Sequence, residues 1–399
     1  MKSLEFNKYN VTFIGLLLFH IVVLVYLAND FSIASRELNI FENKIGFAGW
    51  TSHFFENIFP LNSVTIKLPF IIFYTFSSIL LYLLTDDYFR YQKDRVLASA
   101  IFMILPGVNS AAIMLNESIV VIFFTLLYLY LYKLKGKENY FLLFLYLFID
   151  NSFAILYLAL FFYSMKKKDD RLLFVSLILF GLSMSIYGFE IGGKPQGYLI
   201  DTFGIYASVF SPLLFLYFFY AIYRFGIKYD RDMYWYLAIT ALLLSFVFSL
   251  RQKVYLEDFA PFVVVAIPVM VKLIMHSTRV RVKEHSGNYR FLGYLLLFSL
   301  ILNFGVFVLN KTLYLVLENP KKHFAYDYHI VKELAQVLKD KKISAVKCQD
   351  KGLSQRLKFY GIEIGGKYLL QEIKLNNKKS DIDIAYFGKS VAKFDLLRR

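Results

Sequence analysis

The feature that most constrains this chain is a succession of apolar runs, each long enough or almost long enough to cross a lipid bilayer. A membrane-spanning helix needs about 20 consecutive apolar residues. Such runs recur at residues 11–28, 64–84, 96–114, 119–132, 172–189, 206–223, 233–250, 259–275 and 291–309. The mean hydropathy of +0.51 and the 58% share of hydrophobic residues lie outside the range of soluble globular proteins. An α-helical polytopic membrane protein is therefore predicted.

One further apolar run, residues 140–165, is interrupted by Asp150, Asn151 and Ser152, and it decides the topology. As one helix it would be about 39 Å long, whereas two short helices that meet at the polar tip would return the chain to its starting side. Only the second arrangement keeps every Lys/Arg-rich connection on one side, as the positive-inside rule requires. It predicts about eleven spans and a cytoplasmic N-terminus. The long loop 29–63 and the C-terminus then share the outer face.

Charge and cysteine content exclude several classes of protein. Most of the basic residues behind the net charge of +15 lie in short connections between apolar runs, where membrane orientation explains them, so nucleic acid is excluded as a partner. The single Cys348 cannot form an internal disulfide, and no Cys/His spacing typical of a metal site is present. No metal ligand is assigned, although the sequence leaves open whether a divalent cation serves as a cofactor. The abundance of Lys, Asn, Phe and Ile is typical of a bacterial protein.

The character of the sequence changes after residue 309, where charged and apolar residues mix. Helical spacing of apolar residues predicts helices at 328–340 and 352–360, and short β-prone runs predict strands at 343–346 and 382–387. We therefore predict a transmembrane domain over residues 1–310, with its first outer loop at 29–63. A small α/β domain over residues 311–399 is expected on the periplasmic side of a bacterial inner membrane.

The first outer loop carries the most conspicuous polar residues. Asp30 follows the first apolar run directly, so it would stand where a membrane helix emerges; Glu37 lies one short segment further on. Amphipathic alternation over residues 40–59 predicts helices on the membrane surface. The simple alternative is that Asp30 is a solvated helix-end residue and that His53 is a packed or interfacial side chain.

Several weak motifs, taken in order, resemble a known family. An acidic residue follows the first helix, Lys67 precedes Leu-Pro at the entry of the second, Pro106-Gly107 ends the third and Glu117 opens the fourth. The stretches 250–271 (LRQKVYLEDFAPFVVVAIPVMV) and 334–361 extend the likeness. This order resembles the polyprenyl-phosphate-sugar-dependent glycosyltransferases of the GT-C fold, the class that contains protein mannosyltransferases and aminoarabinose transferases. The resemblance implies a GT-C-like membrane domain and sugar transfer from a lipid phosphate.

Such a transferase needs a base for the acceptor hydroxyl, cations for the departing phosphate and an apolar groove for the polyprenyl tail. Asp30 suits the first role, with Glu37 as the second candidate. Arg251 and Lys253 suit the phosphate, because Arg binds phosphate through two parallel hydrogen bonds. The alternative role for Arg251 and Lys253 is that their side chains contact lipid headgroups.

Four further residues complete the expected site. Tyr255 is expected to donate a hydrogen bond to the phosphate. Glu117 and Lys67 are expected to support the acceptor or the base, together with His53. Three of these four residues have a simpler explanation: Tyr255 in an aromatic belt, Glu117 as a favourable charge at a helix N-terminus and His53 as a packed ring.

The sequence thus predicts an inner-membrane glycosyltransferase that moves a sugar from a polyprenyl phosphate to a lipid, glycan or protein acceptor on the outer side. A polymerase or ligase of lipid-linked glycans is disfavoured because no large outer loop occurs late in the chain. A transporter or flippase should show mid-membrane charges and a two-fold repeat of hydropathy. A non-catalytic membrane scaffold is the remaining alternative.

Overall fold

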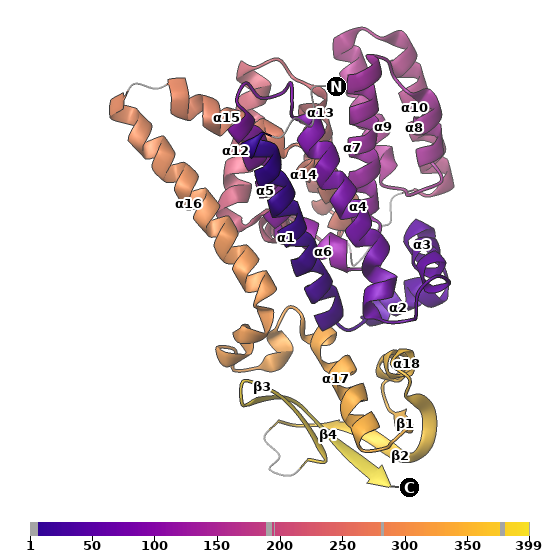
Figure 1. The fold of residues 1–399 in the computed structure, drawn as a ribbon. Coiled ribbons are helices and arrows are strands. Elements are labelled where there is room, and N and C mark those ends of the chain that lie inside the picture. The colour runs from indigo at the N-terminus through magenta and orange to yellow at the C-terminus, as the bar shows by residue number, and fades with distance from the viewer. Residues whose placement is uncertain (1–6, 189–193, 195, 281–282, 376–379, 399) are drawn as a thin grey trace. The chain divides into compact units, whose positions relative to one another are not determined.

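The computed structural model describes residues 7–188, 194, 196–280, 283–375 and 380–398 (Figure 1). The chain forms two compact units. The first comprises Met1–Val22, Phe70–Ala112 and Asn116–Phe304, and the second comprises Val23–Pro69, Ile113–Leu115 and Gly305–Arg399. The first outer loop therefore belongs to the same unit as the C-terminal domain.

Helices form at the apolar runs, which confirms the predicted helical membrane class. They are α1 (Lys8–Asp30), α4 (Ser63–Leu84), α5 (Gln92–Ile104), α6 (Pro106–Ile113), α7 (Ser118–Lys135), α8 (Tyr140–Tyr146), α9 (Phe153–Lys167), α10 (Asp170–Ile186), α11 (Leu199–Phe210), α12 (Pro212–Lys228), α13 (Met233–Ser249), α14 (Leu256–Val264), α15 (Ile267–Val280) and α16 (Lys283–Val308). Among the described residues, 4 helices are long and apolar enough to cross a membrane, or up to 7 if each bent pair is one span.

The run 140–165 forms two helices, α8 and α9, and the chain reverses direction between them. The Tyr157 hydroxyl donates to the Leu143 carbonyl at 2.8 Å. Along one continuous helix these residues would lie about 21 Å apart. At the polar tip the Asp150 carboxylate accepts the Ser152 backbone N–H at 2.9 Å, which stabilises the turn. The two-helix interpretation is confirmed.

The apolar run 206–223 does not form one straight helix, because the chain bends by 103° between α11 and α12. Ser211 at the break has a φ of 94°. Pro212 has no N–H to continue the helix, and its ring disfavours helical geometry at the preceding residue. Pro106 similarly separates α5 from α6, at 56°. The hydropathy of a run predicts that its residues lie in the membrane. It does not predict the direction in which the chain runs there.

The first outer loop folds into two short helices, α2 (Ser35–Glu42) and α3 (Gly46–Glu56), as the amphipathic pattern predicted. Gly49 of α3 lies so close to α2 that a Cβ there would be 2.7 Å from the Ile40 carbonyl. Trp50 and Phe54 of α3 and Ile58 just after it, spaced four residues apart, are exposed. This exposed apolar stripe is suited to a lipid interface.

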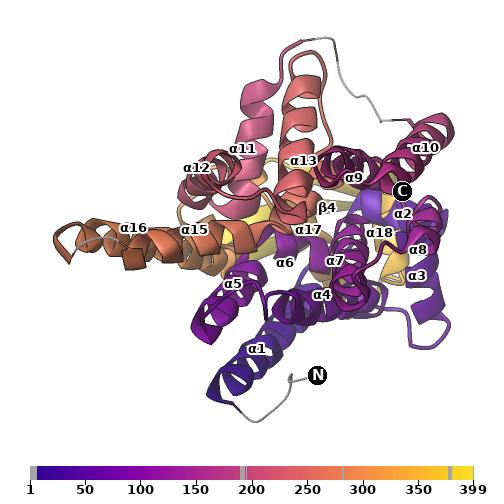
Figure 2. The ribbon, with the colours of Figure 1, turned by 90° about the horizontal axis from the view of Figure 1, so that it is seen from above.

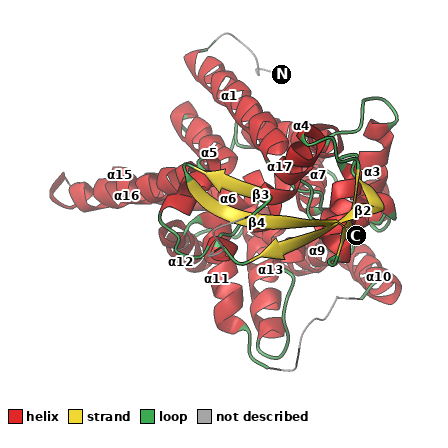
Figure 3. Cartoon of the chain, turned by 90° about the horizontal axis from the view of Figure 1, so that it is seen from below, coloured by secondary structure: helices red, strands yellow, loops and turns green. Residues whose placement is uncertain are grey.

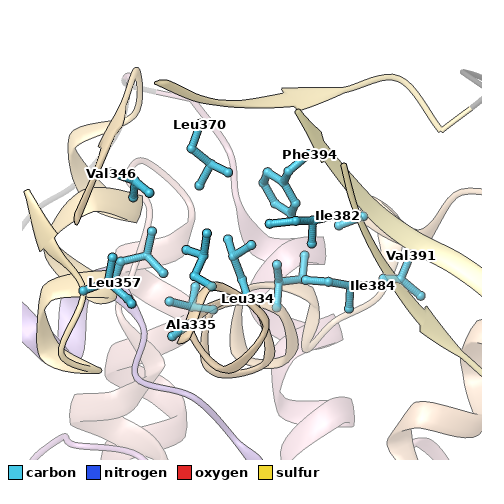
Figure 4. Close-up of a cluster of buried hydrophobic side chains, with 14 of the residues drawn as sticks. Leu334, Ala335, Val346, Leu357, Leu370, Ile382, Ile384, Val391 and Phe394 are labelled. Carbon is cyan, nitrogen blue, oxygen red and sulfur yellow. The ribbon is translucent and has the colours of Figure 1, made fainter. Parts of the chain in front are cut away.

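The C-terminal domain has a four-stranded sheet with strand order β1-β2-β4-β3 (Figure 3). Its elements are η1 (Asn310–Leu315), η2 (Pro320–Lys322), α17 (Tyr326–Asp340), β1 (Ala345–Cys348), α18 (Lys351–Phe359), β2 (Glu363–Ile373), β3 (Ile382–Tyr386) and β4 (Lys389–Arg398). Strands β1 and β2 are parallel, and the other two pairs are antiparallel. Leu334 of α17 packs with Val346, Leu370 and Phe394 of the sheet (Figure 4).

Both predicted strands and both predicted helices of this domain are confirmed, whereas β2 and β4 were missed. The Gly365-Gly366 pair lies inside β2 where the register with β1 shifts. Both glycines have positive φ, and a Cβ on Gly366 would be 2.8 Å from the Ala345 carbonyl. Glycine is therefore needed for close backbone approach at this irregularity.

Cys348 in β1 offers a test of the predicted outward C-terminus. An impermeant thiol reagent is expected to label it in intact spheroplasts. Burial raises the pKa of this half-buried thiol, so labelling should be slow at neutral pH and should accelerate by about tenfold per pH unit below the pKa. Cys348→Ser is the unlabelled control. Labelling that requires a broken membrane would contradict an outward domain.

Candidate functional site

Asp30, the proposed base, is the last residue of α1 and is held by an ion pair within the second unit. Its Oδ1 accepts a hydrogen bond from Lys311 Nζ at 2.7 Å. The two side chains are about one fifth exposed, 20% for Asp30 and 24% for Lys311. Lys311 also lies 3.3 Å from Glu333 of α17. The carboxylate is thus oriented by a lysine from η1, yet solvent still reaches it.

Lys311 keeps its charge in this position. Burial alone would lower its pKa, but the hydrogen bond and charge of Asp30, together with Glu333, outweigh burial and raise the pKa. The ammonium also lies 4.8 Å from the centre of the Tyr386 ring, a favourable cation–π contact. The pair therefore persists at and above neutral pH.

Two more lysines fix the backbone on either side of Asp30. Lys332 of α17 donates to the Asn29 backbone carbonyl at 2.5 Å and to the Asn29 side-chain oxygen at 3.0 Å. Lys67 of α4 is fully buried and donates to the Phe31 carbonyl at 2.9 Å. The segment 29–31 is thus anchored by three lysines from three different elements. The structure thus places the Lys67 ammonium against the backbone of Phe31, the residue after Asp30.

Glu37, the second candidate base, is only 4% exposed, and both of its oxygens accept backbone N–H groups. Oε2 accepts from Ala34 at 2.8 Å, at the start of α2, and Oε1 accepts from Leu115 at 3.0 Å. These bonds give Glu37 a structural role, in which it ties α2 to the segment Ile113–Leu115. Asp30 is the better placed of the two carboxylates for chemistry.

Glu37→Gln is expected to destabilise the protein by about 1–3 kcal/mol, because the amide nitrogen cannot accept one of these two buried N–H groups. Thermal unfolding of the detergent-solubilised protein measures the change. Glu42→Gln, at an exposed position of the same helix, is the matched control. An unchanged unfolding temperature for Glu37→Gln would show that these two bonds contribute little.

His53 is packed within α3 and its surroundings, in agreement with the simpler of its two interpretations. Its ring stacks on Phe41 with centroids 4.4 Å apart, and Nε2 lies 2.7 Å from the Phe41 carbonyl. Nδ1 lies 2.9 Å from Glu56. Both ring nitrogens are therefore engaged locally.

The residues predicted to bind the donor phosphate belong to the first unit. Arg251, Lys253 and Tyr255 are exposed and lie in the connection between α13 and α14. Within the part of the chain that the structure describes, the side chains of Arg251 and Lys253 have no ion-pair or hydrogen-bond partner. Two exposed cations two residues apart can bind a phosphate without first breaking an internal salt bridge.

Glu117 comes close to the same connection. It is the residue before α7, and the hydroxyl of its neighbour Ser118 donates to the Glu257 carbonyl at 3.2 Å. Glu257 stands only two positions after Tyr255. The structure therefore brings the predicted supporting carboxylate and the predicted phosphate-binding stretch together in the first unit.

Sequence reasoning missed Lys311, Lys332 and Glu333, which complete the surroundings of Asp30. The two lysines contact residues about 300 positions away in the chain, at 281 positions for Lys311 with Asp30 and 303 for Lys332 with Asn29. The local sequence carries one signal: Lys311 follows the last apolar run just as Asp30 follows the first.

The apolar packing behind Asp30 contains a neutral histidine. The Phe31 ring lies 5.5 Å from the ring of His329, whose Nδ1 is 2.9 Å from the Tyr314 hydroxyl. Burial, with the nearby charges of His323 and Lys311, lowers the pKa of His329 to about 3. Among the described residues, no group of three or more His, Cys, Asp or Glu side chains could hold a metal ion.

These features define a polytopic helical membrane protein whose first outer loop forms one unit with a small C-terminal α/β domain. The chain is similar in structure to ArnT from Cupriavidus metallidurans, in a crystal structure bound to undecaprenyl phosphate (TM-score 0.54, 10% identity, 89% of this chain and 86% of that chain covered). It is also similar to the apo structure of that protein (TM-score 0.52, 11% identity, 88% and 84% covered). No family model and no curated protein matches the sequence. ArnT has the GT-C fold, so the GT-C-like fold predicted from the sequence is confirmed.

Proposed function

We propose that this protein is an integral membrane glycosyltransferase that transfers a sugar from a polyprenyl-phosphate-linked donor to a lipid, glycan or protein acceptor. The observation that carries the proposal is Asp30, a carboxylate held at the end of the first membrane helix by Lys311. Support also comes from the fold, which is shared with a structure that contains undecaprenyl phosphate.

In the proposed reaction Asp30 acts as the general base. The acceptor hydroxyl gives its proton to the carboxylate while its oxygen bonds to the anomeric carbon of the sugar. The bond between that carbon and the donor phosphate oxygen breaks, and its electron pair leaves with the polyprenyl phosphate. A positioned base contributes about 10²- to 10⁴-fold to such a step. Because Oδ1 of Asp30 accepts the hydrogen bond from Lys311, Oδ2 is the oxygen that takes the proton.

Arg251 and Lys253 are proposed to hold the departing phosphate, with Tyr255 as a further donor. Charge develops on the phosphate as the sugar bond breaks, and fixed cations stabilise that charge. Lys67 supports the base by fixing the Phe31 carbonyl next to Asp30. Glu117 is proposed to orient the acceptor from the start of α7.

The proposed location is the bacterial inner membrane, with the N-terminus in the cytoplasm. Residues 1–310 then supply the membrane domain, and residues 311–399 supply a periplasmic domain. Asp30 and the acceptor face the periplasm in this arrangement. Membrane lipids are the remaining partners.

The proposal can be tested by incubating purified full-length protein with a polyprenyl-phosphate sugar and a broad acceptor mixture. Release of polyprenyl phosphate with a matching amount of glycosylated acceptor is the expected result. The transporter or flippase alternative predicts movement of intact donor across proteoliposomes with no bond cleavage. A non-catalytic scaffold predicts neither cleavage of the donor nor its movement across the membrane. Intact donor after incubation with a broad acceptor mixture would argue against the transferase.

A further inference from the structure

A cleft of about 380 Å³ lies within the first unit among α5, α12, α15 and α16. Seen from above, α5 and α12 lie on opposite sides of the α15–α16 pair (Figure 2). Helix α16 contributes little to the packed interior, since Phe291 and Tyr294 are 68% and 70% exposed. The cleft has the volume of a small-ligand site, and the proposed transfer reaction does not use it.

The mouth of the cleft is cationic. Lys93 near the start of α5, Arg279 near the end of α15 and Arg290 of α16 all line it. Arg279 is neutralised by Asp94, to which it donates from two nitrogens, one of them at 2.6 Å. Lys93 and Arg290 are exposed, and neither has a carboxylate partner among the residues that the structure describes. Two positive charges are therefore left over at the mouth.

The interior of the cleft is apolar. Leu97 and Ile101 of α5 line it on one side, Leu214 of α12 on another and Ile274 with Leu296 on the α15–α16 side. At 1.5 Å per residue, Ile101 lies about 12 Å along the helix from Lys93, and Leu297 lies about 10 Å from Arg290. The surface thus changes from cationic to apolar over the length of a headgroup and the upper part of an acyl chain.

We propose that this cleft binds an anionic phospholipid, with the phosphate between Lys93 and Arg290 and the acyl chains along the apolar walls. A free anion would gain nothing from those walls, and a zwitterionic lipid would leave the extra positive charge uncompensated. The basic connections that contain Lys93 and Arg290 are predicted to face the cytoplasm. The occupant is therefore a phospholipid of the inner leaflet, on the opposite side from the proposed transfer site.

Native mass spectrometry of the full-length protein with dioleoyl phosphatidylglycerol tests this site, with dioleoyl phosphatidylcholine as the comparison. One phosphatidylglycerol per chain should bind more tightly than phosphatidylcholine. The K93Q/R290Q double variant should bind it about 30-fold more weakly, because each basic residue near an anionic headgroup contributes about a factor of five. K135Q/K137Q removes the same charge from exposed lysines at the end of α7 and just after it, and this variant should bind as the wild type does.

A second variant blocks the cleft without changing charge. A Cβ added at Gly293 would point toward Ile274, 3.6 Å from its Cδ1, so Gly293→Phe should fill the apolar part and abolish lipid binding. Equal binding of the two lipids would overturn the proposal, as would equal losses in the two double variants. Displacement of the lipid by inorganic phosphate alone would make the cleft a simple anion site, and preference for undecaprenyl phosphate would assign it to a polyprenyl chain. Either result would also overturn the proposal.

Discussion

Asp30→Asn is expected to lower turnover by about 10²- to 10⁴-fold, because an amide cannot take the acceptor proton at neutral pH. The substitution keeps the size of the side chain and retains an oxygen that accepts from Lys311, so folding and donor binding should persist. Turnover of purified protein with saturating donor measures the loss. Binding of polyprenyl phosphate to the same preparation separates a catalytic defect from a binding defect.

Glu333→Gln is the matched control, since it removes the other carboxylate that contacts Lys311, at 3.3 Å, and leaves the proposed base untouched. Its turnover should stay near that of the wild type. If Asp30→Asn turns over normally while folded Glu37→Gln is inactive, the base has been misassigned within the first outer loop. If both variants remain active, the transfer mechanism loses its central residue and the transporter alternative gains support.

The helices could be predicted because their cause is local. A run of apolar residues must form a helix in a membrane, since every backbone N–H and C=O needs an internal partner there. The interruption at Asp150 likewise predicted the reversal between α8 and α9, because a polar tip cannot stay in the apolar core. The direction of the chain after Ser211 has a different origin. Pro212 was visible in the sequence, but hydropathy alone does not distinguish a kinked span from two helices at 103°.

The strands β2 and β4 were missed because their burial is uneven along their length. In β2 exposed and intermediate residues alternate irregularly, and Gly365-Gly366 break the pattern at the register shift. Only pairing with β1 and β4 explains why this polar segment is extended. Strand propensity depends on such neighbours more than helix propensity does.

In the candidate site, too, some features follow from the local sequence and others depend on tertiary contacts. Asp30 could be selected from its position after an apolar run and from a family resemblance. The pairing of Asp30 with Lys311 depends on how the last membrane helix returns to the first, and no local pattern encodes that return. The structural role of Glu37 was equally hidden, because its partner Leu115 lies 78 residues away. Two carboxylates in the same loop thus acquire different contacts through tertiary structure.

Arg251 is expected to set the affinity for the donor phosphate. Arg251→Lys keeps the charge but loses the pair of parallel hydrogen bonds, and Arg251→Ala loses both. Affinity for polyprenyl phosphate should therefore fall in the order wild type, Lys, Ala. The loss for Ala is expected to be about 1.5–3 kcal/mol, the value of a charge-assisted hydrogen bond, or about 10- to 150-fold in Kd. Titration calorimetry in detergent measures each value.

Arg171→Ala, which removes an exposed arginine at the start of α10, is the control for a general loss of positive charge. It should bind donor as the wild type does. Asp30→Asn should also bind donor normally while losing turnover, so the two substitutions separate phosphate binding from proton transfer. Equal donor binding by wild type, Arg251→Lys and Arg251→Ala would make Arg251 an interfacial anchor, and Lys253 would then be the cation to replace next. A parallel fall in binding for Arg171→Ala would instead trace the effect to the overall charge of the protein, which weakens with added salt.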